Sequence, residues 1–231
     1  MRQILFDYPK NAVFGRVLPK SKIYQHTNPK TALKELFIRQ VEQVVWQYKL
    51  APETINLSPS PTVSEIQIFT VTLKTGDIQH DVLECIDQAI THPIVFELYF
   101  GEKVKAIAAF KSTKNPNCPI KIVSNYFEST WMPRETTRIP LPMVLDFDLL
   151  YSSILAPLLP FPARPGERLD ERVDRMEQIR SKQRELEKCE ICLRREKQFN
   201  RKVALNAALR KLKQEIEILT QEQYQHCKEQ P

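Results

Sequence analysis

The stretch ERLDERVDRMEQIRSKQRELEKCEICLRREKQFNRKVALNAALRKLKQEIEILTQEQYQHCKEQ, residues 167–230, contains no glycine and no proline. It is rich in Glu, Arg, Lys, Gln and Leu, which are strong helix formers, so it predicts long helix. The residues before it are numerous enough to form a buried core. We therefore expect a globular head over residues 1–160, a proline linker over 161–165 and a helical arm over 166–231. This build is more typical of a partner-binding or assembly protein than of a free-standing enzyme.

The apolar residues of the arm form two heptad series with a polar stretch between them. The second series steps by four and three residues, as in a coiled-coil seam: Leu205, Leu209, Leu212, Ile216 and Leu219. The first series comprises Leu169, Val173, Met176, Ile179, Leu186 and Leu193. Between the two series the seam positions carry Arg194, Gln198 and Arg201, and charged residues in a seam are costly unless paired. The interruption favours a helical hairpin that turns near Phe199-Asn200. A continuous coiled coil and a homodimer through the arm are the alternatives.

Hydrophobic periodicity in the head predicts both strands and helices. Strands are expected where side chains alternate or where β-branched and aromatic residues cluster, at 65–74, 94–100, 104–110, 120–127 and, as an edge strand, 137–141. Gly101-Glu102 predicts a tight turn that pairs the second and third of these strands. Helices are expected at 28–49, 77–90 and 144–154, the first starting at Asn28-Pro29. Residues 13–24 are expected to hold short extended pieces. Together these elements predict an α+β sandwich with helices on a mainly antiparallel sheet.

Several common classes of site find no support in the sequence. The four glycines are far apart, so they form no phosphate-binding loop or dinucleotide fingerprint, and the four histidines form no zinc motif. Cys189 and Cys192 have metal-ligand spacing but lie in the middle of a helix pattern, far from His226-Cys227 along the chain. We therefore expect no metal site and no cofactor.

The cellular location is read from the cysteines and the apolar runs. Five cysteines without a hydrophobic leader after Met1 favour a reducing, cytoplasmic compartment. The most apolar run, residues 149–161, is short and contains Pro157 and Pro160, so no membrane span is expected.

One weak catalytic hypothesis rests on charged residues in neighbouring expected strands. Glu65, Glu97 and Lys111 would together resemble a metal-dependent nuclease site if they converged. The lysine expected two residues after Glu97 is absent, because Tyr99 occupies that position. Alternation along the strand also allows Glu97 to face outward.

Two surfaces are candidates for binding a partner. The stronger is the segment 194–213, which has eight basic residues against one acid, Glu196. Its net charge suits nucleic-acid phosphates or an acidic protein face, although a solvated helix face explains it equally well. The candidate residues are Arg194, Arg195, Lys197, Arg201, Lys202, Asn206 and Arg210. The weaker candidate is a base-stacking surface of Tyr126 and Trp131 with Lys121, Arg134 and Arg138, for which strand aromatics packed on the core are the simpler interpretation.

Three segments carry a resemblance to a known family: Phe96-Glu97-Leu98, Ala109-Phe110-Lys111 and, above all, EKQFNRKVALN at residues 196–206. On these segments the chain resembles a bacterial family, domain of unknown function 4391, over nearly its whole length. The resemblance implies an α+β head followed by a charged helical tail. Members of the family tend to lie beside SNF2-type helicases and DNA methyltransferases in restriction-like antiphage clusters. The resemblance therefore implies an accessory subunit of a defence system, and it transfers no catalytic residues.

Sequence and resemblance together predict a non-enzymatic adaptor. Its head would dock on a helicase or DNA methyltransferase subunit, and its basic arm segment would contact a second protein or DNA. The alternatives are a metal-dependent nuclease that uses Glu65, Glu97 and Lys111, and a DNA-binding protein that dimerises through the arm.

Overall fold

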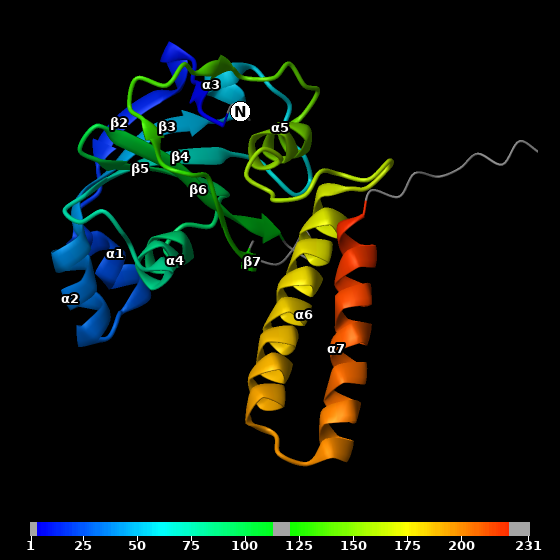
Figure 1. Ribbon diagram of the computed structural model, residues 1–231. Coiled ribbons are helices and arrows are strands. Elements are labelled where there is room, and N and C mark those ends of the chain that lie inside the picture. The colour runs from blue at the N-terminus through cyan, green and yellow to red at the C-terminus, as the bar shows by residue number, and fades with distance from the viewer. Residues whose placement is uncertain (1–3, 113–120, 222–231) are drawn as a thin grey trace, which may run out of the picture. The chain divides into compact units, whose positions relative to one another are not determined.

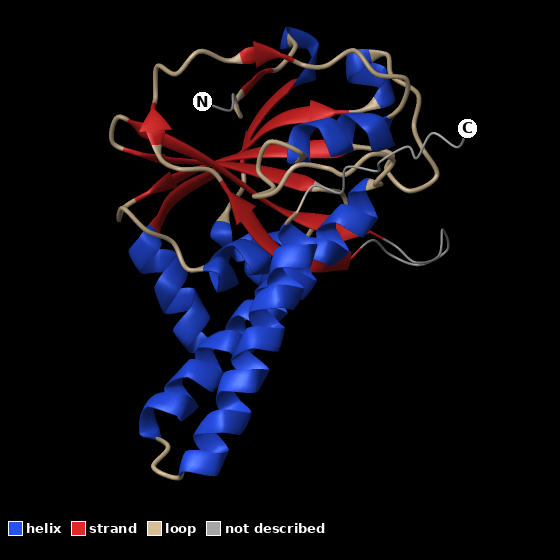
Figure 2. Cartoon of the chain, turned by 45° about the vertical axis from the view of Figure 1, so that its right-hand side comes forward, coloured by secondary structure: helices blue, strands red, loops and turns tan. Residues whose placement is uncertain are grey.

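The computed structural model describes residues 4–112 and 121–221 of the chain. Internal contacts divide it into two compact units, Met1–Leu158 and Leu159–Pro231, which we describe separately as the head and the arm. The fold is α+β, with a mainly antiparallel sheet in the head and a pair of long helices in the arm (Figures 1 and 2). None of the described helices is long and apolar enough to cross a membrane.

The principal sheet of the head has the strand order β2-β3-β4-β5-β6-β7 within the described residues. Its strands are β2 (Val13–Val17), β3 (Val41–Leu50), β4 (Ile66–Leu73), β5 (Ile94–Phe100), β6 (Lys103–Ser112) and β7 (Lys121–Glu128). Neighbours are antiparallel except β4 and β5, which are parallel and are joined through helix α4 (His80–Gln88). The short strand β8 (Met132–Pro133) also pairs with β6. Strands β1 (Phe6–Asp7) and β9 (Ile139–Pro140) form a separate parallel pair.

The two faces of the sheet carry different helices. Helices α1 (Lys20–Thr27), α2 (Thr31–Gln40) and α4 cover one face, which we call the α4 face. Their buried residues, such as Phe37 and Ile86, form one hydrophobic cluster with Phe69 and Phe96 of the strands. Helix α5 (Phe147–Leu155) covers part of the opposite face, which we call the α5 face, where the Tyr151 ring stacks on the Phe110 ring at a centroid distance of 5.8 Å. The sheet is thus the middle layer of a sandwich.

Most of the expected strands and helices of the head are confirmed. Strand β5 has the bounds expected from sequence, and β4, β6, β7, α4 and α5 differ from expectation only at their ends. The tight turn at Gly101, whose φ of 54° suits glycine, joins β5 to β6 as expected. The segment expected as an edge strand at 137–141 contributes only β9, which pairs with β1 outside the principal sheet.

The helix expected over residues 28–49 is wrong in its second half. Helix α2 ends at Gln40, and the chain continues at once as β3 between β2 and β4. Valine, tryptophan and tyrosine at 41–48 favour strands, and pairing on both sides outweighs their helix-like spacing. Asn28 does not start this helix but ends α1 in the left-handed conformation, with φ of 44°. Residues 20–24, expected to be extended, belong to α1. The short helix α3 (Pro52–Ile55) follows β3.

The arm is a helical hairpin, as the interrupted seam predicted. Helices α6 (Leu169–Arg195) and α7 (Phe199–Thr220) run antiparallel, because Lys182 pairs with Glu215 whereas Cys189 lies nearer the turn, with its Sγ 3.7 Å from the Leu205 carbonyl. The turn falls at residues 196–198, slightly before the position expected. A continuous helix is therefore not formed.

The proline-containing segment before α6 is held to the arm by hydrogen bonds. The Arg172 guanidinium donates to the Phe161 carbonyl, and Arg175 donates to the Pro162 carbonyl at 2.8 Å. Residues 161 and 162, expected to belong to a linker, are thus hydrogen-bonded to side chains of α6.

Candidate partner-binding site

The turn of the hairpin, residues 194–203, gathers most of the cationic candidates predicted from the sequence, and we call it the hairpin tip. Its local structure depends on Glu196, which follows the last residue of α6. The Glu196 carboxylate accepts hydrogen bonds from the backbone amides of Lys197 at 2.8 Å and Gln198 at 2.9 Å. These amide hydrogen bonds, the Gln198 contact first, lower the pKa of Glu196 below its usual value. Glu196, the one acid of the tip, therefore stabilises the turn between α6 and α7 through two hydrogen bonds.

Five cations surround this turn: Arg194, Arg195, Lys197, Arg201 and Lys202. All five side chains are exposed. Arg201 lies 3.9 Å from the Glu196 carboxylate, and the other four have no ion pair among the residues that the structure describes. The tip thus carries a concentrated positive charge.

The placement of the cations is unusual at the start of α7. Arg201 and Lys202 lie in its first turn, which contains no acidic residue. Backbone amides at a helix N-terminus already give that end a partial positive charge, so cations there are unfavourable for the isolated helix. Arg194 and Arg195, at the end of α6, have the favourable arrangement. Departures from such local preferences are expected at functional sites, and the cations at the start of α7 are a departure of this kind.

Exposed apolar side chains lie among the cations. Phe199 is 77 % exposed and Val203 is 53 % exposed, and both belong to the first turns of α7. Large aromatic and arginine side chains supply most of the binding energy in protein–protein interfaces. The tip therefore combines an exposed aromatic side chain with exposed arginines.

The two remaining candidates lie further along α7. The Asn206 side-chain amide donates to the Lys202 carbonyl one turn earlier, at 2.9 Å, so it is engaged within its own helix. Arg210 is exposed but eleven residues beyond Phe199, or about 16 Å along a helix at 1.5 Å per residue. Neither residue is part of the tip.

The three residues of the nuclease hypothesis do not come together. Glu97 of β5 is directed to the α5 face, whereas Lys111 of β6 reaches α4 on the opposite face. Glu65 lies just before β4 and pairs with Lys49 at 3.4 Å. Separation across the sheet leaves no place where all three could bind one metal ion. Among the described residues, no group of three or more histidine, cysteine or acidic side chains could hold a metal.

Glu97 is committed to an ion pair that the sequence did not indicate. Both of its oxygens accept from the Arg138 guanidinium, at 2.8 and 2.6 Å, and Oε2 also accepts from the Tyr99 hydroxyl at 2.9 Å. Hydrogen bonding to Glu97 raises the pKa of Arg138 above its usual value. Burial, reinforced by the adjacent carboxylate, raises the pKa of Tyr99 to about 12. At neutral pH Arg138 is therefore charged and the Tyr99 hydroxyl is neutral.

Lys111 has a structural partner as well. Its ammonium lies 2.6 Å from the Asp87 carboxylate and donates to the carbonyls of Asp87, Ile90 and His92 at the end of α4. The Tyr126 hydroxyl donates to the same carboxylate at 2.9 Å. Burial lowers the pKa of Lys111 and raises that of Asp87, and their pairing opposes both shifts. These contacts anchor α4 to the sheet.

The candidate base-stacking surface is not assembled, and the simpler interpretation is confirmed, because Tyr126 and Trp131 pack on the hydrophobic cluster. Tyr126 is buried in the cluster of the α4 face, whereas Arg138 lies with Glu97 at the other face. Trp131 instead faces the Lys105 ammonium, 5.6 Å from its ring centre. Cys192 is exposed, and His226-Cys227 lies outside the described residues.

Sequence reasoning missed the residues that neutralise the charged strand positions. Asp87 and Arg138 are 24 and 41 residues from Lys111 and Glu97, so no local pattern links the partners. Phe199 could have been found, since it is the aromatic residue within the basic segment.

A family model described as a domain of unknown function (DUF4391) matches residues 6–216 of the chain. The match includes the principal sheet, the hairpin tip and most of α7. No curated protein and no solved structure matches the chain.

Proposed function

The chain belongs to the DUF4391 family, and from this premise we propose that it is a non-enzymatic accessory subunit whose hairpin tip binds a protein partner. The observation that supports the proposal is the exposed cluster of five cations around the exposed Phe199. A helicase or DNA methyltransferase of a bacterial antiphage system is the partner that we propose, and an acidic patch on it would complement the tip.

The composition of the tip favours a protein over nucleic acid as its target. Phosphate contacts require only cations, whereas an exposed phenylalanine with a neighbouring valine gains most by entering an apolar pocket. Opposite charges around that pocket would increase the association rate and fix the orientation of the complex. DNA binding through the five cations is the competing outcome.

The test is a pull-down of the tagged full chain with its genomic neighbours expressed, with and without nuclease treatment. We expect a stoichiometric helicase or methyltransferase that survives nuclease. The variant Arg194→Glu/Arg201→Glu/Lys202→Glu should lose this partner, because three charges are reversed at the tip. The matched control Arg184→Glu/Lys188→Glu/Lys211→Glu reverses three exposed charges elsewhere on the hairpin and should retain it.

A second variant separates apolar contact from charge. Phe199→Ala should weaken partner binding at least tenfold, as expected for a central aromatic anchor. Because the side chain is exposed, its removal should leave the thermal unfolding midpoint nearly unchanged. Ile218→Ala, also on an exposed apolar side chain of α7, is the control. Binding that is lost after nuclease treatment, or that is insensitive to both tip variants, would refute a protein-binding tip.

A further inference from the structure

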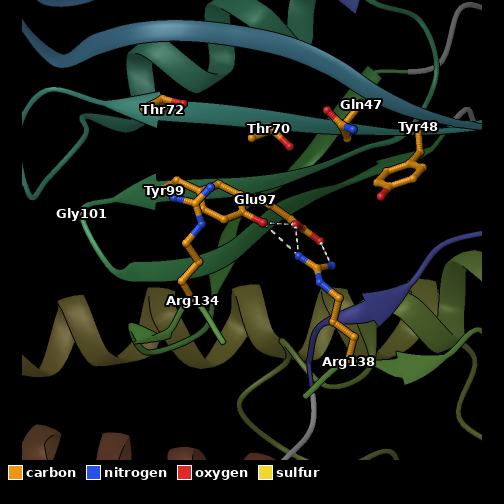
Figure 3. Close-up of a pocket in the computed structure, with 9 residues that line it drawn as sticks. All are labelled: Gln47, Tyr48, Thr70, Thr72, Glu97, Tyr99, Gly101, Arg134 and Arg138. Atoms are coloured by element: carbon orange, nitrogen blue, oxygen red, sulfur yellow. Dashed lines mark hydrogen bonds and ion pairs between the residues drawn. The ribbon is translucent and has the colours of Figure 1, made fainter. Parts of the chain in front are cut away.

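A polar pocket of about 380 Å³ lies on the α5 face of the head, and residues of the head alone line it. Its floor is formed by neighbouring strands: Thr70 and Thr72 of β4 and Glu97 and Tyr99 of β5. Gln47 and Tyr48 of β3 line one side, and Arg134 and Arg138 reach in from the segment after β7 (Figure 3). The volume is within the range of small-molecule sites.

The pocket interrupts an otherwise apolar sheet surface. Earlier along the same two strands, the alternating positions of this face are the fully buried Ile66 and Ile68 of β4 and the buried Val95 of β5. At the pocket the corresponding positions become threonine, glutamate and tyrosine. Packing in the core would favour further apolar side chains, so the change in chemistry needs another explanation.

The Glu97–Arg138 pair gives the pocket a fixed and electrically neutral wall. Arg138 is anchored at three points, by both Glu97 oxygens and by the Phe6 carbonyl at 2.8 Å, and it also donates to the Tyr99 hydroxyl. A bidentate arginine–carboxylate pair of this kind has little freedom to move. It therefore orients Tyr99 without contributing net charge.

Arg134 is the cation that remains available. Its guanidinium lies over the Tyr99 ring, 5.2 Å from the centroid, and it has no ion pair among the described residues. Its backbone amide is fixed by a hydrogen bond to the Glu102 carbonyl at 2.9 Å. Figure 3 shows the Arg134 side chain beside Tyr99. A guanidinium stacked on a ring in this way can still donate its in-plane N–H groups to a ligand. The pocket thus has one unneutralised positive charge.

Further polar groups of the lining are also uncommitted. The side chains of Gln47, Thr70 and Thr72 have no hydrogen-bond partner among the residues described. An amide and two hydroxyls offer both donors and acceptors to a ligand. With Arg134 they converge on one space, which is larger than an isolated phosphate ion requires.

We propose that this pocket binds a small phosphorylated ligand of nucleotide size, with Arg134 holding the phosphate and the strand amide and hydroxyls holding its neutral part. A phosphate monoester matches the single free guanidinium, which can donate two parallel hydrogen bonds to it. This site is independent of the hairpin tip and of its protein partner.

The experiment is isothermal titration calorimetry of the full chain with AMP, GMP, CMP and UMP, with adenosine and inorganic phosphate as separate ligands. At least one nucleotide should bind, and more tightly than either its nucleoside or phosphate alone. Arg134→Ala should weaken that binding at least tenfold, and Thr70→Val several-fold. The control is Arg16→Ala, because Arg16 is an exposed arginine that also lies over an aromatic ring, that of Phe14, outside the pocket.

Three results would overturn the proposal. The first is that no nucleotide binds. The second is that the nucleoside or inorganic phosphate binds as tightly as the nucleotide. Equal binding of the nucleoside would mean that the phosphate contributes nothing, and equal binding of phosphate would mean the same of the neutral part. The third is nucleotide binding that survives both Arg134→Ala and Thr70→Val, which would place the ligand elsewhere. Because these variants lie in the head and none touches the tip, their failure leaves the proposed partner binding intact.

Discussion

At the scale of single residues, each face of the sheet in the head holds an ion pair whose carboxylate is buried, Lys111–Asp87 on the α4 face and Glu97–Arg138 on the α5 face. Lys111 is 2 % exposed and Asp87 is 1 % exposed, and the ammonium satisfies three carbonyls at the end of α4 as well as the carboxylate. A buried charge is tolerated only when its partner and hydrogen bonds are all present. From the sequence, Lys111 was a candidate catalytic residue. In the structure it pairs with Asp87 and anchors α4 to the sheet.

The first prediction concerns this buried pair. Lys111→Met should destabilise the protein by roughly 3–5 kcal/mol, because it leaves the Asp87 carboxylate buried without its counter-charge. Urea unfolding followed by circular dichroism measures the change. Lys103→Met, on the exposed end of the same strand, should change stability by less than about 0.5 kcal/mol. A similar small loss in both variants would show that the buried pair contributes little.

The second prediction concerns Glu167 and pH. Burial alone would raise the pKa of this carboxyl, but hydrogen bonds from Arg175 at 2.6 and 2.8 Å and from the Arg164 amide at 2.9 Å hold it below its usual value. A lowered pKa means that the folded state binds this proton less tightly than the unfolded state. The stabilising contribution is therefore present at neutral pH and is lost as the pH falls through the folded-state value.

Glu167→Gln should accordingly lower the urea midpoint at pH 7 and have a much smaller effect at acid pH. The comparison is made between wild type and variant at both pH values. Glu185→Gln, on an exposed part of α6, serves as the control and should have little effect at either pH. An effect of Glu167→Gln that is equal at both pH values would mean that the carboxylate charge is not what stabilises the segment.

At the scale of elements, the apolar seam of the arm is buried between two helices of the same chain. Leu209 is buried, and Leu205, Leu212, Ile216 and Leu219 are half-buried on α7. Ion pairs cross the hairpin between Lys182 and Glu215, and between Lys213 and Glu190 at 3.8 Å. The apolar seam of α7 packs on α6. Less apolar surface is therefore left to bind a second copy of the chain.

The third prediction follows from this use of the seam. Leu205→Asp/Leu212→Asp should open the hairpin, because two carboxylates would replace leucines between the helices. We expect lower helicity in circular dichroism and faster cleavage of the arm by trypsin. Light scattering of the wild type should give the mass of a monomer. A dimeric wild type that becomes a well-folded monomer in the variant would instead support dimerisation through the arm.

At the scale of the whole molecule, the chain has two compact units with a separate candidate site on each. The hairpin tip combines cations with Phe199, and the head pocket combines Arg134 with polar strand residues. The two sites share no residue, and each is formed within one unit. Energetic effects at sites without shared partners are expected to add.

The fourth prediction is therefore independence of the two sites. Arg134→Ala should leave capture of the protein partner unchanged, and Arg194→Glu/Arg201→Glu/Lys202→Glu should leave the nucleotide affinity unchanged. Pull-down and calorimetry on the same two variants measure both quantities. A loss of partner capture in the pocket variant would show instead that the ligand and the partner are coupled.

The sequence by itself determined those features that depend on neighbouring residues. The absence of glycine and proline from residues 167–230 predicted the helical arm, and its broken seam predicted the hairpin, because helix period and breakers are local properties. Strand β5 and its turn at Gly101 followed from β-branched residues and a glycine suited to positive φ. The cations of the tip were found because they lie close together along the chain.

Only the tertiary structure decided the features that depend on distant residues. Residues 41–50 carry spacing compatible with a helix, and they form β3 because β2 and β4 supply partners on both sides. The positions of the charged candidates were also decided by the fold. Glu97 and Lys111 are close in sequence but lie on opposite faces of one sheet. Their partners, Arg138 and Asp87, are brought to them by the fold. Long-range pairing leaves no local signal, so the head pocket could be recognised only once the strands were assembled.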